Sequence, residues 1–240
     1  MGYFKDLGGM KTTDDKTVKY GYLIKSSHLK KAKQKLAGAK KIIDMRIEDE
    51  KESKPEVIFE GVKYLHMPIF NDTMAGVTHE NKGDKIDQIK RVPSMTEIYQ
   101  YMVSDEYCYT NLSKIMKEII NSDVYPVEYH CAEGKDRTGI ITMLIYSILG
   151  VDQESIINDY LYVNKKNGFK SNVYYAAVLV MKGDKALAQK IKDFTTAHTE
   201  YILAAIDSIN EKFGSMEEYI KNQLKITDEE KTKFKNMMLK

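Results

Sequence analysis

The 240-residue chain has few of the residues and patterns that mark several large classes of protein. Its two cysteines, Cys108 and Cys131, are too few for a disulfide framework and suit a reducing compartment. No apolar run approaches the length of a membrane span, and a net charge of +2 is too small to indicate nucleic-acid binding. We therefore expect no membrane span and no nucleic-acid partner.

The chain also lacks internal repeats, low-complexity tracts and linkers rich in proline or glycine. Its length and its apolar fraction of 42% are ordinary for one large soluble domain. The sequence therefore predicts a single domain over residues 1–240. Because no secretory signal is evident, we expect a cytoplasmic protein, or a secreted one if an N-terminal segment precedes Met1.

Arginine is scarce in this lysine-rich chain, so its positions are informative. Only three of the 37 basic residues are arginine, namely Arg46, Arg91 and Arg137. Arg137 lies in the run HCAEGKDRTG, residues 130–139, with five residues between it and Cys131. Because arginine is so rare in this chain, an arginine at this spacing indicates a specific role rather than ordinary surface solvation.

The surroundings of this run are typical of a strand, a tight loop and a helix. The apolar residues Val124–Tyr129 precede the run, and the apolar segment Ile140–Leu149 follows it. Such a loop directs backbone N–H groups and the positive end of a helix dipole to one point, which is an anion site. We expect Cys131 to be a thiolate there, because helix N-termini and nearby cations stabilise the charged sulfur. Since the Arg137 fork matches phosphate oxygens, the pattern indicates phosphoryl transfer by covalent catalysis.

Two other interpretations of the run explain less. A nucleotide-binding P-loop does not fit, because Gly134-Lys135 is followed by Asp136 rather than by serine or threonine. A buried structural cysteine is common after a strand, but this interpretation does not explain why Arg137 and Gly134 are present.

The run resembles the signature of the cysteine-dependent protein tyrosine phosphatases, and GKDRTG is similar to their atypical bacterial branch. Members of that branch often act on phosphotyrosine and phosphoinositides. The resemblance covers nearly the whole chain, through FKDLGG at 4–9, IIDMR at 42–46 and FGSMEEY at 213–219. Ala132-Glu133 departs from the small-residue pair that is commoner in the family.

The resemblance implies a role for each residue of the loop. Cys131 is the expected nucleophile, and Arg137 with the backbone N–H groups of 132–137 is expected to stabilise the phosphoryl oxygens. Substrate binding is expected from the loop residues Ala132, Glu133, Gly134, Lys135 and Thr138, and the Thr138 hydroxyl is placed to bond the sulfur. No cofactor and no metal is implied.

The leaving group needs a proton, and the sequence offers two kinds of acid. Asp136, inside the loop, has this role in relatives that share Lys-Asp-Arg. Most tyrosine phosphatases use an aspartate on a separate mobile loop, for which Asp72 is the best candidate here, ahead of Asp84 and Asp87. We favour Asp136, with an ion pair that only braces the loop as its alternative role.

Four further residues are expected to support the site, in addition to Lys135. The His130 ring is expected to bond the loop backbone, and Asp44 and Arg46 lie at the end of a predicted strand, where α/β sites form. Asp6 is expected to line the site. Lys135 is expected at the rim as a charge for a second phosphate, with Asp44 as its candidate partner.

The fold class follows from alternating patterns. Strands are predicted at Tyr20–Lys25, Lys41–Met45, Val62–Ile69 and Val124–His130, with helical patterns between them. The chain is therefore α/β, with a mainly parallel sheet flanked by helices and a helical C-terminal part. Residues 165–198 are expected to be helical in their second half. The family resemblance implies that this segment is a lid, and an ordinary core helix is the alternative.

The leading hypothesis is a phosphatase for phosphotyrosine, with a scope that can extend to other phosphomonoesters. A phosphoinositide phosphatase is the second hypothesis, supported only by Lys135. A phospho-binding protein without turnover is the alternative of another class, but such a protein does not need the thiolate. A sulfur-transfer or arsenate-reducing enzyme normally needs a different loop spacing or resolving thiols, and only Cys108 is available.

Overall fold

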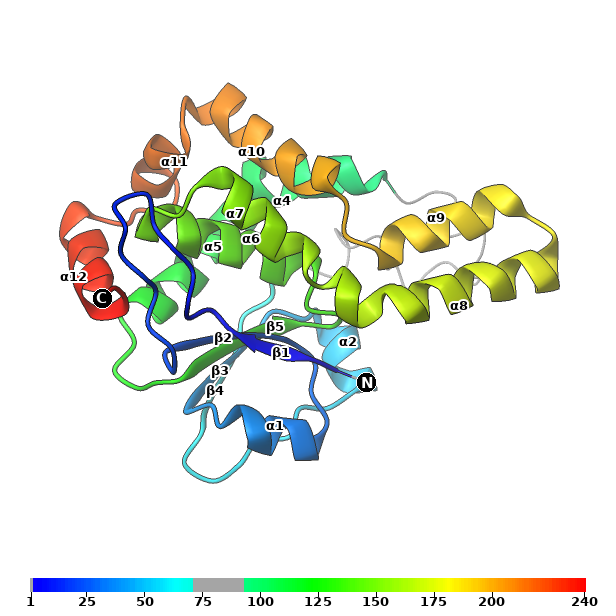
Figure 1. Cartoon of the computed structure of the whole chain (residues 1–240), viewed down its shortest axis with the longest axis horizontal. Helices are drawn as coiled ribbons and strands as arrows, with labels where there is room; N and C mark the ends of the chain where they lie inside the picture. Colours follow the sequence, from blue (N-terminus) through cyan, green and yellow to red (C-terminus); the bar gives the residue numbers. More distant parts are fainter. Residues whose placement is uncertain (1, 71–92) are drawn as a thin grey trace.

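A computed structural model describes residues 2–70 and 93–240, which are arranged around a five-stranded sheet (Figure 1). Across the sheet the strands are β1 (Phe4–Asp6), β2 (Leu23–Ser27), β5 (Val127–Cys131), β3 (Lys41–Asp44) and β4 (Lys63–His66). Neighbouring strands are parallel, except that β1 is antiparallel to β2. The expected α/β class with a mainly parallel sheet is therefore confirmed.

Helices cover both faces of this sheet. The described helices are α1 (Lys31–Ala37), α2 (Glu48–Ser53), α4 (Met95–Ser104), α5 (Glu106–Ile120), α6 (Asp136–Leu149), α7 (Gln153–Leu161), α8 (Asn164–Lys182), α9 (Lys185–Thr195), α10 (Thr199–Phe213), α11 (Met216–Asn222) and α12 (Asp228–Met238). Helix α1 lies on one face, and α5, α6, α7 and α10 lie on the other (Figure 1).

Strand β5 and helix α6 form the centre of the core. All five residues of β5 are buried, and α6 is buried on nearly every side between Thr138 and Leu149. This helix packs against β5 and against α5, α7, α10 and α12. Because close-packed interiors resist displacement, the loop that joins β5 to α6 is held at a rigid junction.

Side-chain caps begin several of the surrounding helices, as the sequence indicates. Ser94 accepts a hydrogen bond from the backbone N–H of Glu97 (3.3 Å), and the Glu97 carboxylate accepts one from Ser94 N–H (2.8 Å). Thr227 and Glu230 repeat this capping box at α12. Asp152 begins α7 by accepting the backbone N–H three residues later. These bonds satisfy N–H groups that have no partner within the helix.

The predicted strands are present with shifted bounds, and one strand is not predicted. Strand β4 covers only the first part of Val62–Ile69, and β2 begins three residues after Tyr20. The sequence does not predict β1, because three residues at a sheet edge, half exposed, are too few to show a period of two. Its place is fixed by pairing with β2.

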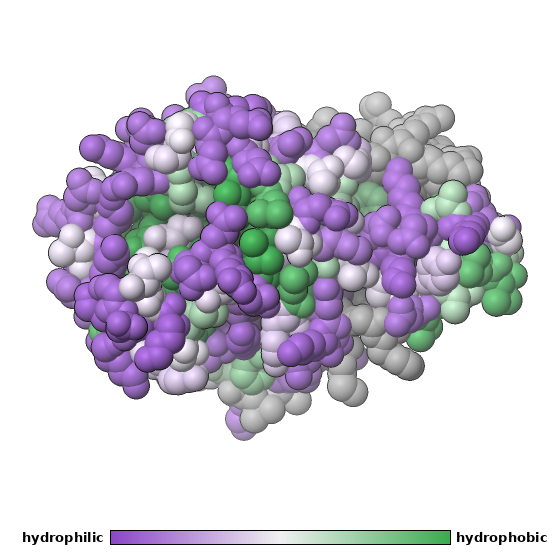
Figure 2. Space-filling model, turned by 45° about the horizontal axis from the view of Figure 1, so that its top comes forward, coloured by the Kyte–Doolittle hydropathy of each residue, from purple (hydrophilic) through white to green (hydrophobic). Residues whose placement is uncertain are grey.

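Helices α8 and α9 form a hairpin that extends away from the sheet and its covering helices (Figure 1). Helix α8 begins at Asn164, so the segment expected to be helical only in its second half is helical throughout most of its length. Val180 and Met181 near its free end are 86% and 77% exposed, and Figure 2 shows apolar surface at that end. A role as a lid stays a prediction. Among the described helices, none has the length and apolar character needed to cross a membrane.

Candidate active site

The loop of residues 132–135 is held from behind by the end of β2. The backbone N–H of His28 donates to the carbonyl oxygens of Cys131 and of the residue after it (3.0 and 3.2 Å). Gly134 has a φ of +67°, and a Cβ atom there would lie 2.7 Å from the Ser26 carbonyl oxygen. Both the backbone conformation and the close approach therefore require glycine at this position.

Cys131 is the last residue of β5 and is only 2% exposed. The hydroxyl of Thr138, in the first turn of α6, donates a hydrogen bond to its Sγ atom (3.3 Å), as expected from the sequence. Helix α6 begins at Asp136, so the positive end of its dipole lies beside the loop. The Thr138 hydroxyl and the start of α6 therefore both lie at the Cys131 sulfur.

The guanidinium of Arg137 is oriented by α2. Its Nη1 donates to Glu50 Oε2 (2.5 Å) and to the Met45 carbonyl oxygen (3.2 Å), and its Nη2 donates to Glu50 Oε1 (2.8 Å). Burial alone would raise the pKa of Glu50, but the Arg137 hydrogen bonds hold it below its usual value. These contacts use three of the five N–H donors. The Nε–H and the other Nη2–H share one edge of the planar group, where they form a two-donor fork.

The carboxyl group of Asp136 is braced on one oxygen. The Tyr99 hydroxyl donates to Oδ1 (2.7 Å), and the Lys135 amine lies 3.2 Å from the same atom. The Asp136 side chain is 27% exposed, so it is also partly accessible. This geometry fits the role of an acid, and it fits the alternative role of a brace within the loop.

The Lys135 amine does not lie at an exposed rim. The residue is 3% exposed, and its Nζ donates to the carbonyl oxygens of Phe194 (2.8 Å) and Thr196 (3.1 Å) at the end of α9. The expected rim position and the expected pairing with Asp44 are therefore wrong, because carbonyl groups and Asp136 satisfy this ammonium. The side chain instead connects the loop to the base of the α8–α9 hairpin, while its backbone N–H stays part of the loop.

Asp44 and Arg46 form a buried ion pair behind the loop. Arg46 Nε and Nη2 donate to the two carboxylate oxygens of Asp44 (2.9 and 2.6 Å), and Nη2 also donates to Glu56 (3.0 Å). Burial alone would raise the pKa of Asp44, but these hydrogen bonds hold it at about 2. Arg46 is thus engaged with acids rather than with the substrate loop.

His130 connects this ion pair to the loop. Its Nδ1 lies 3.2 Å from the Cys131 carbonyl oxygen, which is the expected contact with loop backbone, and its Nε2 lies 3.3 Å from Glu56 Oε2. Burial would lower the pKa of His130, but Glu56 and Asp44 raise it above the usual value. The two carboxylates therefore favour the protonated form of the ring, which lies beside the backbone of Cys131.

Asp44, Glu56 and His130 also offer three metal-ligand atoms within 4.8 Å of one another. The Arg46 guanidinium already bonds both carboxylates, so a cation placed among them would be repelled. This described cluster is therefore an ion-pair network rather than a metal centre.

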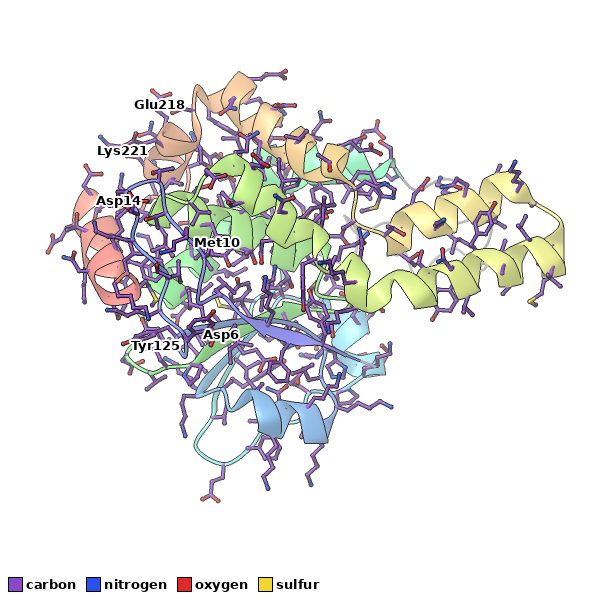
Figure 3. The ribbon with its side chains drawn as sticks, viewed as in Figure 1. Asp6, Met10, Asp14, Tyr125, Glu218 and Lys221 are labelled. Atoms are coloured by element: carbon purple, nitrogen blue, oxygen red, sulfur yellow. The ribbon has the colours of Figure 1, made fainter. Side chains whose placement is uncertain are left out.

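Asp6 lies away from the loop. Its carboxylate accepts the backbone N–H groups of Gly8 (2.7 Å) and Gly21 (2.8 Å), which holds the turns that flank the residue. In the sheet it pairs with Ile24, whereas Ser27 pairs with Cys131. Figure 3 shows Asp6 at the end of β1. The expectation that Asp6 lines the site is wrong.

The alternative acids Asp72, Asp84 and Asp87 lie outside the described residues. Ala132 and Glu133 lie in the loop as expected, the first half-buried and the second exposed. Sequence reasoning missed Glu50 and Tyr99. Glu50 belongs to a run of acidic residues that resembles a solvated helix face, and Tyr99 is one of 17 tyrosines without a distinguishing pattern.

A separate cavity of about 390 Å³ lies beside the second half of α6. Apolar side chains form much of its lining, among them Met143, Ile148, Ile156, Ile206 and Ile220, with Lys231 and Lys235 also present. It contains no residue of the 130–138 run, so it is not the site described above.

Comparisons with known proteins agree with this geometry. A family model described as the tyrosine phosphatase family matches residues 3–240. The triple specificity protein phosphatase of Mycobacterium tuberculosis is 31% identical over 106 residues, which cover 40% of this chain and 38% of that protein. A putative tyrosine-protein phosphatase of Cupriavidus necator is 21% identical over 234 residues, which cover 92% of this chain and 81% of that protein. The match therefore spans less than half the length of the mycobacterial relative.

Proposed function

The chain belongs to the tyrosine phosphatase family, and from this premise we propose that it hydrolyses phosphotyrosine in proteins through a phosphocysteine formed on Cys131. As a protein-tyrosine-phosphatase-like hydrolase it is an enzyme rather than a passive phospho-binding module. The observation that carries the proposal is the single loop that joins Cys131, its donor Thr138 and the pre-oriented Arg137 fork.

In the first step the Cys131 thiolate attacks phosphorus in line with the leaving oxygen. The S–P bond forms while the P–O bond to the leaving group breaks, and Asp136 gives its proton to the departing oxygen. The loop N–H groups and the free edge of Arg137 stabilise the three phosphoryl oxygens, which carry charge throughout.

In the second step water attacks the phosphocysteine. The Asp136 carboxylate takes a proton from this water, the new O–P bond forms and the S–P bond breaks. The sulfur leaves as a thiolate, which the Thr138 hydroxyl stabilises through its hydrogen bond. The enzyme then returns to its starting protonation state with inorganic phosphate as the product.

We assign the whole chain, residues 1–240, to one phosphatase domain, in which the 165–198 segment is a helical lid or insertion. Phosphoinositide hydrolysis is the less favoured activity, because its only sequence signal was Lys135 at the rim and this amine is buried. Phosphoinositide hydrolysis is therefore measured in the test below and is not proposed as a second function.

The test measures phosphate release from a phosphotyrosine peptide, a phosphoserine peptide and a phosphoinositide. The wild type is compared with Cys131→Ser and with Cys108→Ala, which changes the other buried thiol. We expect the wild type to release phosphate fastest from the phosphotyrosine peptide. This release should be lost in Cys131→Ser and retained in Cys108→Ala. Hydrolysis by Cys131→Ser within about tenfold of the wild type would overturn the nucleophile. Faster release from the phosphoinositide would overturn the substrate class.

A further inference from the structure

Two buried tyrosine hydroxyls meet behind the carboxyl group of Asp136. Tyr99 comes from α4 and Tyr160 from α7, and they are 0% and 4% exposed. The Tyr99 oxygen lies 2.7 Å from Asp136 Oδ1 and 2.7 Å from the Tyr160 oxygen. The Tyr160 ring reaches this position beside Gly139 of α6, where a Cβ atom would lie 2.9 Å from the ring.

The direction of this hydrogen-bonded chain follows from its protons. Tyr99 has one hydroxyl proton, which it donates to Asp136, so the Tyr160 hydroxyl must donate to the Tyr99 oxygen. Burial raises the pKa of both tyrosines, so both hydroxyls keep their protons. Because linked hydrogen bonds polarise one another, Tyr160 makes Tyr99 a stronger donor.

A positive charge also lies near the same carboxyl oxygen. The Lys135 amine lies 3.2 Å from Oδ1 and is itself fixed by the carbonyl groups of Phe194 and Thr196. Oδ1 thus accepts the Tyr99 hydroxyl and faces a positive charge, and both disfavour a proton on this oxygen. When Asp136 is protonated, the proton is therefore carried on Oδ2.

We propose that Tyr99, supported by Tyr160, is a positioning residue for the acid, which holds Asp136 Oδ1 so that Oδ2 carries the proton toward the leaving oxygen. The inference rests on the proposed role of Asp136. As the P–O bond breaks, the proton passes from Oδ2 to the leaving oxygen and Asp136 becomes a carboxylate. The Tyr99 donor is strongest toward that charged product, so it favours the proton transfer itself.

Other ionisable groups also face Asp136 and are part of its environment. They are Lys135 and Arg137 from the loop and first turn of α6, Tyr99 from α4, Tyr160 from α7 and Tyr201 from α10. The Lys135 amine also lies 5.9 Å from the centre of the Tyr201 ring. Only Tyr99 and Lys135 have a donor within 3.2 Å of Oδ1 among the described residues. Tyr99 is the better probe, because its hydroxyl can be removed without a change of charge.

The experiment compares Tyr99→Phe with Tyr146→Phe, which removes a buried tyrosine hydroxyl that bonds the Leu7 carbonyl oxygen instead. Each variant is assayed across pH with a phosphotyrosine peptide, whose leaving group is poor, and with an activated aryl phosphate. We expect Tyr99→Phe to slow the peptide by about tenfold and the activated ester by less than about twofold. Tyr146→Phe should change both substrates by the same factor.

The pH profile distinguishes the positioning role from a purely structural role, because loss of a purely structural contact would leave the profile in place. Loss of a donor that favours the carboxylate lets Asp136 keep its proton to higher pH, so the basic limb for the peptide should move upward by about half a pH unit or more. Tyr160→Phe keeps the Tyr99–Asp136 hydrogen bond and should shift the basic limb in the same direction by a smaller amount. If Tyr99→Phe does not fold, the shift in Tyr160→Phe decides the question.

Asp136→Asn, measured beside these variants, separates this inference from the proposed function. If Asp136→Asn shows no dependence on the leaving group, the acid assignment fails and the role of Tyr99 fails with it. If Asp136→Asn shows the dependence while Tyr99→Phe matches Tyr146→Phe, only the positioning role is overturned. An equal loss for both substrates in Tyr99→Phe, without a shift of the basic limb, has the same meaning.

Discussion

The Arg137 guanidinium and the Glu50 carboxylate form a two-point ion pair, with N–O distances of 2.5 and 2.8 Å. Glu50 comes from α2, which directly follows β3, and Arg137 comes from the first turn of α6. The pair uses the end of the guanidinium and leaves its Nε edge for a ligand. In the proposed mechanism Arg137 is therefore already oriented for the phosphate, which reduces the entropy lost on binding.

We expect Glu50→Gln to weaken this orientation without a change of shape. An amide can accept only one of the two Arg137 bonds, and the charge-assisted pair is lost. Activity on phosphotyrosine, measured as kcat/KM, should fall by roughly tenfold or more, and the affinity for vanadate should fall in parallel. Glu48→Gln on the same helix is the control, because Glu48 is half exposed and pairs with Lys51 and His66. Equal losses in the two variants would show that Glu50 does not orient the fork.

The two thiols should react very differently with an alkylating reagent near pH 6. Cys108 is fully buried in α5, where burial together with Asp105 raises its pKa to about 12, so it stays a neutral thiol. In the proposed mechanism Cys131 reacts as a thiolate, beside the Thr138 hydroxyl and the start of α6.

The measurement is mass spectrometry of iodoacetamide adducts, with and without vanadate. Selective labelling of Cys131 that vanadate suppresses is the expected result. Equal labelling of both thiols, unchanged by vanadate, would contradict a thiolate in an anion site.

The loop could be predicted from the sequence because its chemistry is local. Cys131, Gly134 and Arg137 lie within seven residues, and each has a property that few other residue types share. The long-range partners could not be predicted in this way. Glu50 reaches Arg137 across 87 positions of the chain, and Tyr99 reaches Asp136 across 37. Their side chains are common types, and only the packing of α2 and α4 brings them to the loop.

Lys135 shows a different limit of sequence reasoning. A lysine in a loop is usually solvated, and its charge suggested contact with a second phosphate. Its burial depends on two carbonyl groups near the end of α9, at residues 194 and 196. Nothing in the local pattern indicates that these carbonyls lie within reach. Asp6 was misplaced for the opposite reason, because its partners are the local turns at Gly8 and Gly21 rather than the distant loop.

The Asp44–Arg46 pair should make stability depend on pH in acid. The pKa of Asp44 is lowered from 3.8 to about 2 in the folded protein. Its contribution is therefore fully present above about pH 4 and is lost as the pH falls through about 2, because the unfolded chain takes up the proton first. We expect Asp44→Asn to cost at least about 2 kcal/mol of unfolding free energy at pH 7, and about half as much at pH 3.

Denaturant unfolding at the two pH values measures this difference. Asp14→Asn is the control, because the pKa of Asp14 is also lowered to about 2, by its exposed pair with Lys16. An exposed pair is screened by water, so Asp14→Asn should change stability far less. A loss in Asp44→Asn that is the same at both pH values would show that the carboxylate charge is not what stabilises this region.

The identity of the acid is decided by the leaving group. If Asp136 protonates the departing oxygen, Asp136→Asn should slow a phosphotyrosine peptide far more than an activated aryl phosphate, which hardly needs a proton. The basic limb of phosphocysteine formation should flatten, because the acid acts only while protonated, and the acidic limb should stay. Asp72→Asn is the matched variant and should leave the dependence on the leaving group unchanged. The reverse pattern would move the acid to the segment around Asp72. Asp136 would then serve as a brace, for which its bonds to Tyr99 and Lys135 already suffice.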